Sequence, residues 1–170
     1  MQDKLIINKA IPEDAEALLT YMNLVGSETD NLSYGSEGMP MTVEQERIFI
    51  ERMSEAENQV LLVGKIDNEI VCVGSIDTAN RVRLAHLANL AITVRKDFWG
   101  KGFGNAMMEA LIDFCKSTGV HEQIKLTVMS NNERAISLYK KHGFEEYGYM
   151  KNYMKVGNVY HDAVFMILYI

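Results

Sequence analysis

Leu90-Ala91-Ile92-Thr93-Val94-Arg95-Lys96-Asp97-Phe98-Trp99-Gly100-Lys101-Gly102-Phe103-Gly104-Asn105 is the stretch that decides the fold of this chain. Its first part is short, apolar and rich in β-branched residues, which is typical of a buried strand. Glycines at alternate positions follow, and apolar side chains then repeat at helical spacing, at Phe103, Met107, Ala110, Leu111 and Phe114. The stretch therefore predicts a strand that passes through a glycine turn into a helix.

The start of this helix is suited to hold an anion. The first N–H groups of a helix have no partner within the helix, and glycine lets a ligand approach the backbone closely. Two other predicted helices have capping boxes, Thr42 with Gln45 and Ser130 with Glu133, whereas the helix from residue 103 has none. We expect its free donors to bind a phosphate group; the alternative is a purely structural glycine turn.

Two common phosphate-binding motifs do not fit these glycines. The P-loop requires Gly-x-x-x-x-Gly-Lys-Ser/Thr and the dinucleotide fingerprint requires Gly-x-Gly-x-x-Gly, whereas residues 100–104 read Gly-x-Gly-x-Gly. Residues 99–104 instead resemble motif A of the GNAT family of N-acetyltransferases, Arg/Gln-x-x-Gly-x-Gly/Ala. In that family the amides of this turn hold the pyrophosphate of coenzyme A.

Length and composition predict one domain over residues 1–170, with a sizeable core from its 48% hydrophobic content. The formal charge of -6 argues against sequence-independent binding to nucleic acid. Cys72 and Cys115 lie in apolar company without metal-ligand spacing, so we expect buried core residues and no metal. No signal peptide or membrane-spanning stretch is visible, which favours a soluble cytoplasmic protein without a membrane partner.

The remaining segments predict an α/β fold, with a mixed sheet and helices on both faces, in the order β-α-α-β-β-β-α-β-α-β-β. A first helix is expected around Ala15, Leu18, Leu19 and Met22, and residues 25–41 form a long loop of the kind that is functional or disordered. Further helices are expected at 43–57, 103–116 and 131–142, and strands at 4–8, 59–66, 70–76, 84–94, 124–128, 144–150 and 159–168.

A second motif occurs in the helix near Asn132. Asn132 and Tyr139 share one helix face about two turns apart. A tyrosine among Ala135, Ile136 and Leu138 is by itself more typical of a core residue. However, Asn-x-x-Ala-x-x-Leu-Tyr followed by Gly-Phe resembles motif B of the GNAT family, at the family's usual distance after motif A. The resemblance covers nearly the whole chain.

The resemblance implies acetyl-CoA as co-substrate. In the family the strand before the glycine turn splays from its neighbour at a bulge, and the pantetheine arm inserts there like an extra strand. Its backbone partners would be Ile92 and Val94, an amide near Ile92 would polarise the thioester carbonyl, and Asn132 would bind the pantetheine arm. The pyrophosphate would lie along the turn, at Trp99, Gly100, Lys101, Gly102, Phe103, Gly104 and Asn105.

Tyr139 matches the family's proton donor to the leaving thiolate. A phenol of pKa about 10 is protonated at neutral pH, and the conjugate acid of a thiolate has a pKa near 8.5. The chain departs from the family at Trp99, where Arg or Gln is more common, but the turn amides carry most of the expected binding. It also departs at Ala88, where histone-type members have a glutamate base.

The general base is therefore unassigned. An amine of pKa about 10.4 is mostly charged at pH 7, so a base or a water chain is needed. His86 suits by pKa, although a lone histidine on a strand is more often structural, and Asn89 lies on the same strand. Glu28 in the long loop is a further candidate and could attract the ammonium group of the acceptor; the alternative is a solvated acidic loop.

The leading interpretation is acetyl-CoA-dependent N-acetylation of a small primary amine, by direct attack in a ternary complex without an acyl-enzyme. One alternative is acetylation of a protein N-terminus, as in ribosomal-protein acetyltransferases. Another is a non-catalytic acetyl-CoA sensor, which Tyr139 disfavours because binding alone needs no proton donor. A homodimer is also expected, because exposed terminal strands often pair in this family.

Overall fold

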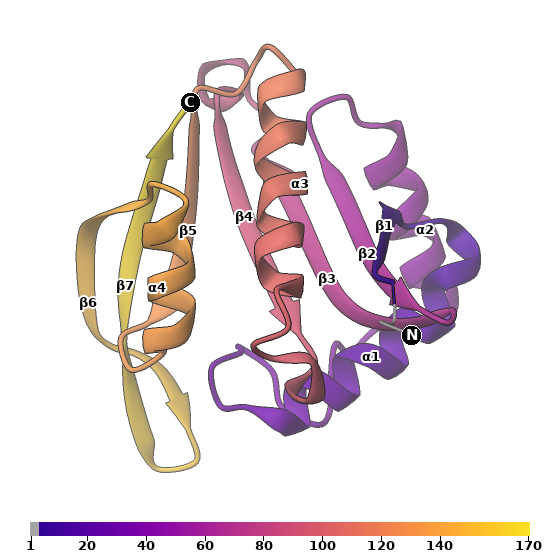
Figure 1. Ribbon diagram of the computed structural model, residues 1–170, viewed down its shortest axis with the longest axis horizontal. Helices are drawn as coiled ribbons and strands as arrows, with labels where there is room; N and C mark the ends of the chain where they lie inside the picture. The colour runs from indigo at the N-terminus through magenta and orange to yellow at the C-terminus, as the bar shows by residue number, and fades with distance from the viewer. Residues whose placement is uncertain (1–3) are drawn as a thin grey trace.

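A seven-stranded mixed sheet forms the centre of the computed structural model, which describes residues 4–170 (Figure 1). The strands follow the order β1-β2-β3-β4-β5-β7-β6, and β4 and β5 are its parallel pair. They are β1 (Ile6–Lys9), β2 (Val60–Ile66), β3 (Glu69–Thr78), β4 (Leu87–Val94), β5 (Gln123–Met129), β6 (Glu145–Val156) and β7 (Val159–Tyr169). The predicted mixed α/β fold is confirmed.

Helices cover both faces of this sheet (Figure 1). On one face α1 (Ala15–Glu28) and α2 (Val43–Glu55) enclose a core that includes Leu18, Ile50 and Val63. On the other face α3 (Phe103–Ser117) and α4 (Glu133–Lys141) pack on a second core, in which Met107 and Leu111 have no exposed surface. The apolar spacing of α3 therefore places one helix face against the strands, as the sequence predicts.

Element boundaries differ from the prediction most clearly at three places. Residues 25–28, expected in the long loop, belong to α1, which continues to Glu28. Val82–Leu84 forms a 3-10 turn, so β4 begins at Leu87 rather than at residue 84. β6 continues to Val156 instead of ending near residue 150, although its pairing with β7 is interrupted between Met150 and Met154. The interruption explains the early end of the predicted strand, because the regular strand pattern is lost there.

β4 and β5 separate after only three paired positions, Leu87 with Gln123, Ala88 with Ile124 and Asn89 with Lys125. Beyond them β4 stays paired with β3, and β5 stays paired with β7 as far as Met129. Each strand follows its own outer neighbour, so the sheet divides into two parts that diverge from this point (Figure 1). The predicted splay is confirmed, but the bulge is not, because β3 and β4 keep one register.

The segment between α1 and α2 is packed closely on α1. A Cβ atom on Gly26 would lie 2.0 Å from the carbonyl oxygen of Gly35. Leu32 and Tyr34 pack against the core beneath α1, and Glu37 accepts a hydrogen bond from the Gly35 N–H at 2.8 Å. The close approach of the Gly26 and Gly35 backbones fixes the position of residues 29–34 against α1.

None of the helices in residues 4–170 has the length and apolar character needed to cross a bilayer. β6 is an edge strand and exposes Tyr147 and Tyr149. The expected homodimer stays a prediction.

We expect Gly26→Ala to lower the free energy of unfolding by about 1–2 kcal/mol, because the new methyl group meets the Gly35 carbonyl oxygen. This overpacking outweighs the gain in helix propensity of about 1 kcal/mol. The corresponding fall in Tm is about 3–6 °C. Ser27→Ala, on the exposed neighbouring residue, is the matched control. An equal or higher Tm for Gly26→Ala would contradict the close approach.

Candidate active site

A cavity of about 570 Å³ lies in the opening between β4 and β5. Its walls come from β4, β5, the glycine turn, α4, the segment after α1, and Tyr153 with Met154 of β6. Most of the residues predicted for acetyl-CoA and catalysis line it together: Ile92, Val94, Trp99, Gly100, Gly102, Gly104, Asn105, Asn132 and Tyr139.

The backbone of the free part of β4 offers hydrogen-bonding groups to this cavity. The Arg95 N–H donates to the Val71 carbonyl at 3.0 Å, which continues the antiparallel register of β3 and β4. Because bonded positions alternate in such a ladder, Thr93 bonds to β3 while Ile92 and Val94 direct their backbone groups toward the opening. The two predicted partners of an added strand therefore face the right side.

The glycine turn has the conformation that the sequence indicates. Gly100 and Gly102 have φ values of 75° and 85°, and no atom lies within 4 Å of a Cβ built on either one. Gly102 is the N-cap of α3 and no side chain caps this helix. The first N–H groups of α3 are thus available for an anion, as predicted.

Two residues of the predicted turn do not line the cavity. Phe103 stacks on Phe98, with ring centroids 5.8 Å apart, and the Lys101 ammonium lies 4.8 Å from the centroid of the Phe98 ring. Both side chains thus contact Phe98, and neither is part of the cavity lining.

Trp99 fastens the turn to the end of β4. Its indole Nε1–H donates to the Val94 carbonyl at 2.7 Å. Its ring carries the Arg134 guanidinium, 3.3 Å from the ring centroid, in a cation–π contact. Arg134 lines the cavity and was missed by sequence reasoning, because its position in the second motif is unspecified and its partner lies on another element.

The cap of α4 differs from the prediction. The sequence suggested a capping box of Ser130 with Glu133, but the N-cap is Asn132, whose Oδ1 accepts from the Ala135 N–H at 3.3 Å. The Asn132 side-chain oxygen is therefore used within the helix, and its amide N–H₂ is the part left for a ligand. By contrast, the predicted box of Thr42 with Gln45 is confirmed.

Tyr139 is nearly buried on α4 and lines the cavity. Its ring packs against Phe144 with centroids 5.9 Å apart. Burial raises the pKa of Tyr139 to about 12, because an ionised phenol is poorly solvated there. The hydroxyl is thus a proton-bearing donor throughout the neutral pH range.

His86 does not reach this cavity. It precedes β4, and its carbonyl accepts from the Glu122 and Gln123 N–H groups at 3.0 and 3.2 Å. Ile92 lies six residues further along, which is about 20 Å in an extended strand. The structure therefore does not bring His86 together with the other predicted residues, because His86 lies before the start of β4 and Ile92 and Val94 lie near its end.

Glu28 lies at the end of α1 rather than in the long loop, and it does not face the expected acceptor site. Its Oε1 accepts from Arg95 Nε at 2.9 Å and its Oε2 accepts from the Lys96 N–H at 2.8 Å. These bonds raise the pKa of Arg95 and join the end of α1 to the start of the turn. The carboxylate, only 17% exposed, does not line the cavity, so the geometry gives it a structural position rather than a substrate-binding one.

Cys72 and Cys115 have no exposed surface. Burial raises the pKa of each thiol to about 12, so neither supplies a thiolate at neutral pH. The prediction that both are core residues is confirmed.

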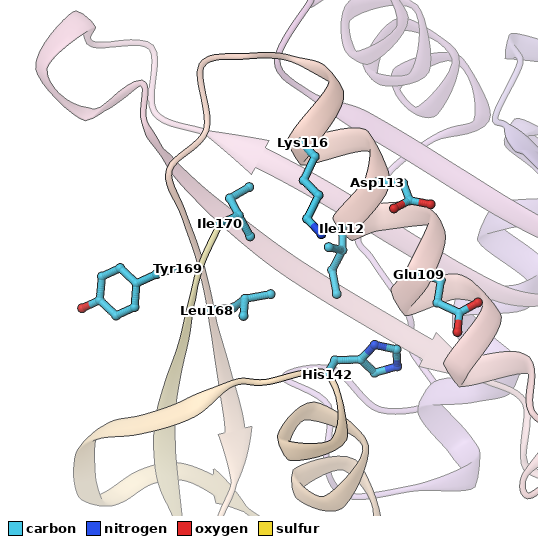
Figure 2. A pocket seen from close by; sticks show the side chains of 8 residues that line it. All are labelled: Glu109, Ile112, Asp113, Lys116, His142, Leu168, Tyr169 and Ile170. Atoms are coloured by element: carbon cyan, nitrogen blue, oxygen red, sulfur yellow. The ribbon is translucent and has the colours of Figure 1, made fainter.

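A second hollow of about 460 Å³ lies between α3 and the end of β7 (Figure 2). Figure 2 shows Glu109, Asp113 and Lys116 of α3 on one side and Leu168 on the other. His142 lines this hollow, and its Nε2 lies 3.1 Å from the Oδ1 of Asn105, which lines the larger cavity. None of the predicted site residues lines the second hollow.

The family model of the acetyltransferase (GNAT) family matches residues 28–144. This segment contains β4, the glycine turn, α3 and α4, which build the cavity. The chain therefore belongs to the GNAT family and is an N-acetyltransferase.

Curated relatives give two kinds of N-acetyltransferase. L-amino acid N-acetyltransferase AaaT of Escherichia coli is 33% identical over 121 residues, which cover 71% of this chain and 75% of that protein. The [ribosomal protein bS18]-alanine N-acetyltransferase of Salmonella typhimurium is 37% identical over 77 residues, 45% of this chain and 51% of that protein. The second match thus spans about half of each protein.

Solved structures share the whole fold. An acetyltransferase of the GNAT family from Streptococcus pneumoniae superposes with a TM-score of 0.96, at 30% identity, over 98% of this chain and all of that one. The structure of yncA from Salmonella typhimurium with its cofactor acetyl-CoA has a TM-score of 0.84 at 18% identity, over 97% of this chain and 93% of that one.

We expect Glu28→Gln to lower the free energy of unfolding by about 1–2 kcal/mol, because two hydrogen bonds lose their charged acceptor. The KM for an acceptor amine should change by less than about twofold. Glu69→Gln, which removes the exposed partner of Arg95, is the control and should cost less than about 0.5 kcal/mol. Thermal unfolding and initial rates measure both. An unchanged Tm with a KM raised about tenfold would restore a substrate-binding role.

Proposed function

We propose that this chain transfers the acetyl group of acetyl-CoA to the primary amine of a small molecule. The proposal rests on the opening between β4 and β5. This opening contains both the unpaired backbone groups of Ile92 on β4 and the uncapped start of α3. An acyl-CoA has a matching sequence of groups, namely a thioester, an extended amide-containing arm and a pyrophosphate.

The residues of the opening fit this ligand part by part. The pantetheine amides would pair with the Ile92 backbone and the Val94 N–H, since the Val94 carbonyl already accepts from Trp99. The Asn132 amide would bind the same arm, and the N–H groups of the turn and the first residues of α3 would hold the pyrophosphate. Arg134 and Lys141 add positive charge beside it.

The reaction would proceed by direct attack. The amine nitrogen forms a bond to the thioester carbon, an amide near Ile92 stabilises the developing oxyanion, and the carbon–sulfur bond breaks. The nitrogen loses one proton and the sulfur gains one, and the Tyr139 hydroxyl donates toward the leaving sulfur. The buried thiols of Cys72 and Cys115 leave no thiolate for an acyl-enzyme.

Acetylation of a protein N-terminus is the second candidate. The partial match to the ribosomal protein bS18 alanine acetyltransferase favours it, and the match to the amino acid acetyltransferase over a larger share of the chain favours a small acceptor. A non-catalytic sensor is disfavoured by Tyr139.

A panel of acceptors tests the proposal. Acetyl-CoA is mixed with amino acids, amino-acid amides, polyamines and N-terminal peptides, and release of free coenzyme A is followed. We expect release with small amines above that with peptides. Preference for a peptide of defined N-terminus would support the second candidate, and tight acetyl-CoA binding without release would support a sensor.

We expect Tyr139→Phe to lower kcat about 100-fold, because the leaving sulfur loses its hydrogen-bond donor. The KM for acetyl-CoA should stay within about twofold, since the ring and its packing remain. Tyr160→Phe removes an exposed hydroxyl outside the cavity and is the matched control. Equal kcat values for wild type and Tyr139→Phe would exclude Tyr139 from the mechanism.

A further inference from the structure

The cavity is lined on the α1 side by the neutral polar side chains of Thr29, Asn31 and Ser33 as well as by apolar and aromatic ones. Val25, Leu32 and Tyr34 line it on the α1 side, and Tyr153 and Met154 line it on the β6 side. Tyr153 is held edge-on by Phe165, with ring centroids 6.0 Å apart. On these two sides an acceptor amine would therefore meet apolar, aromatic and neutral polar side chains, but no charged one.

The titratable and charged side chains that line the cavity, counted over residues 4–170, are three phenols and two cations. They are Tyr34 from the segment after α1, Tyr139, Arg134 and Lys141 from α4, and Tyr153 from β6. Burial raises the pKa of Tyr34 as well as that of Tyr139. Tyr34 and Tyr139 therefore keep their phenolic protons at neutral pH and do not accept a proton from an ammonium group.

The strands supply hydroxyl groups of Thr93 and Thr127 to the same cavity. The Thr93 hydroxyl is 2.9 Å from the Tyr21 hydroxyl, and burial raises the pKa of Tyr21, so this pair also keeps its protons. Neither strand contributes an ionisable group to the described lining.

Several titratable groups adjoin these walls without lining the cavity: Asp30 lies between Thr29 and Asn31, Glu133 lies between Asn132 and Arg134, and His161 is paired with Met154. Other carboxylates nearby are held by hydrogen bonds. Glu28 accepts from Arg95 and the Lys96 N–H, and Glu37 accepts from the Gly35 N–H. Asp162 accepts from the Tyr149 hydroxyl and from the Asn152 N–H. The described lining thus holds no carboxylate, and its two cations, Arg134 and Lys141, are those proposed to lie beside the pyrophosphate.

We propose that the chain admits its acceptor as the neutral amine, and so selects weakly basic α-amino groups on small apolar molecules over strongly basic alkylamines and polyamines. The inference rests on the proposed acetyl transfer and narrows its substrate class. An ammonium group would lose hydration on entering the cavity and would find no carboxylate among the side chains that line it.

The proton balance of the reaction permits this arrangement. A neutral amine carries the proton that the departing sulfur needs, so the nitrogen loses one proton and the sulfur gains one. Tyr139 can pass its own hydroxyl proton to the sulfur and recover one from the nitrogen. Deprotonation of the ammonium form then happens in solution, before binding.

The fraction of each acceptor that is present as the neutral amine predicts the size of the preference between acceptors. The α-amino group of an amino-acid amide or a peptide has a pKa of about 7.7–8.0, and an alkylamine such as the lysine side chain has a pKa of about 10.4. At pH 7.5 about one third of the α-amino groups is neutral, whereas only about 0.1% of the alkylamine is neutral. With otherwise equal contacts, kcat/KM should favour the α-amino acceptor about 250-fold.

Leucinamide and 3-methylbutylamine test the proposal as a matched pair, because they share the side chain and differ in the carboxamide that lowers the amine pKa. The pH dependence of kcat/KM is measured for each with wild-type protein, by release of coenzyme A. We expect a break near pH 8 for leucinamide and near pH 10 for the alkylamine, each at the acceptor's own pKa. His86→Ala and Glu28→Gln should leave both breaks unchanged.

A break at the same pH for both acceptors would overturn the inference, because it would reveal a base on the protein, while acetyl transfer itself would stand. A higher kcat/KM for spermidine than for leucinamide at pH 7.5 would overturn it as well. Absence of coenzyme A release with every amine at every pH would instead contradict the proposed function and remove the inference with it.

Discussion

The opening of the sheet between β4 and β5 is the constraint on which the candidate site depends. β4 is held by β3 over its whole length, whereas β5 is held by β7, and the two strands share only three paired positions. The backbone groups of Ile92 and Val94 therefore face a gap inside the sheet instead of another strand. An exposed strand edge of this kind is a template for an extended chain, and here it is sheltered between the two parts of one sheet rather than at an outer edge.

The glycine turn determines the orientation in which a ligand can occupy this opening. Gly100 and Gly102 adopt left-handed conformations that other residues take at a cost, and they bring the uncapped start of α3 to the end of β4. Trp99 fixes the junction by bonding to the Val94 carbonyl, and Glu28 fixes its other side through Arg95 and Lys96. The hydrogen-bonding edge and the anion-binding helix terminus are thus held in a fixed relation, which suits a ligand that has an amide-containing arm and a phosphate end.

The residues that sequence analysis placed correctly in the cavity belong to short motifs. Ile92, Gly102 and Tyr139 owe their positions to local spacing within one strand, turn or helix, and the family resemblance related the two motifs in space. His86 and Glu28 were misplaced because their neighbours depend on tertiary packing: residue type suggested chemistry, while the far end of β4 and the Arg95 ion pair decided the position. Arg134 was missed for the same reason, since its stacking on Trp99 joins α4 to the turn. Periodicity predicted the sheet and helices, but not the 3-10 turn before β4 or the continuation of β6.

The central claim is that acetyl-CoA binds in the opening between β4 and β5. Amide-resolved NMR of the ¹⁵N-labelled protein during titration with acetyl-CoA tests it most directly. The account predicts that the largest shifts occur at the Ile92 and Val94 amides and along residues 102–105. Shifts that centre on Glu109, Lys116 and His142 around the second hollow, or no shifts at saturating acetyl-CoA, would contradict it.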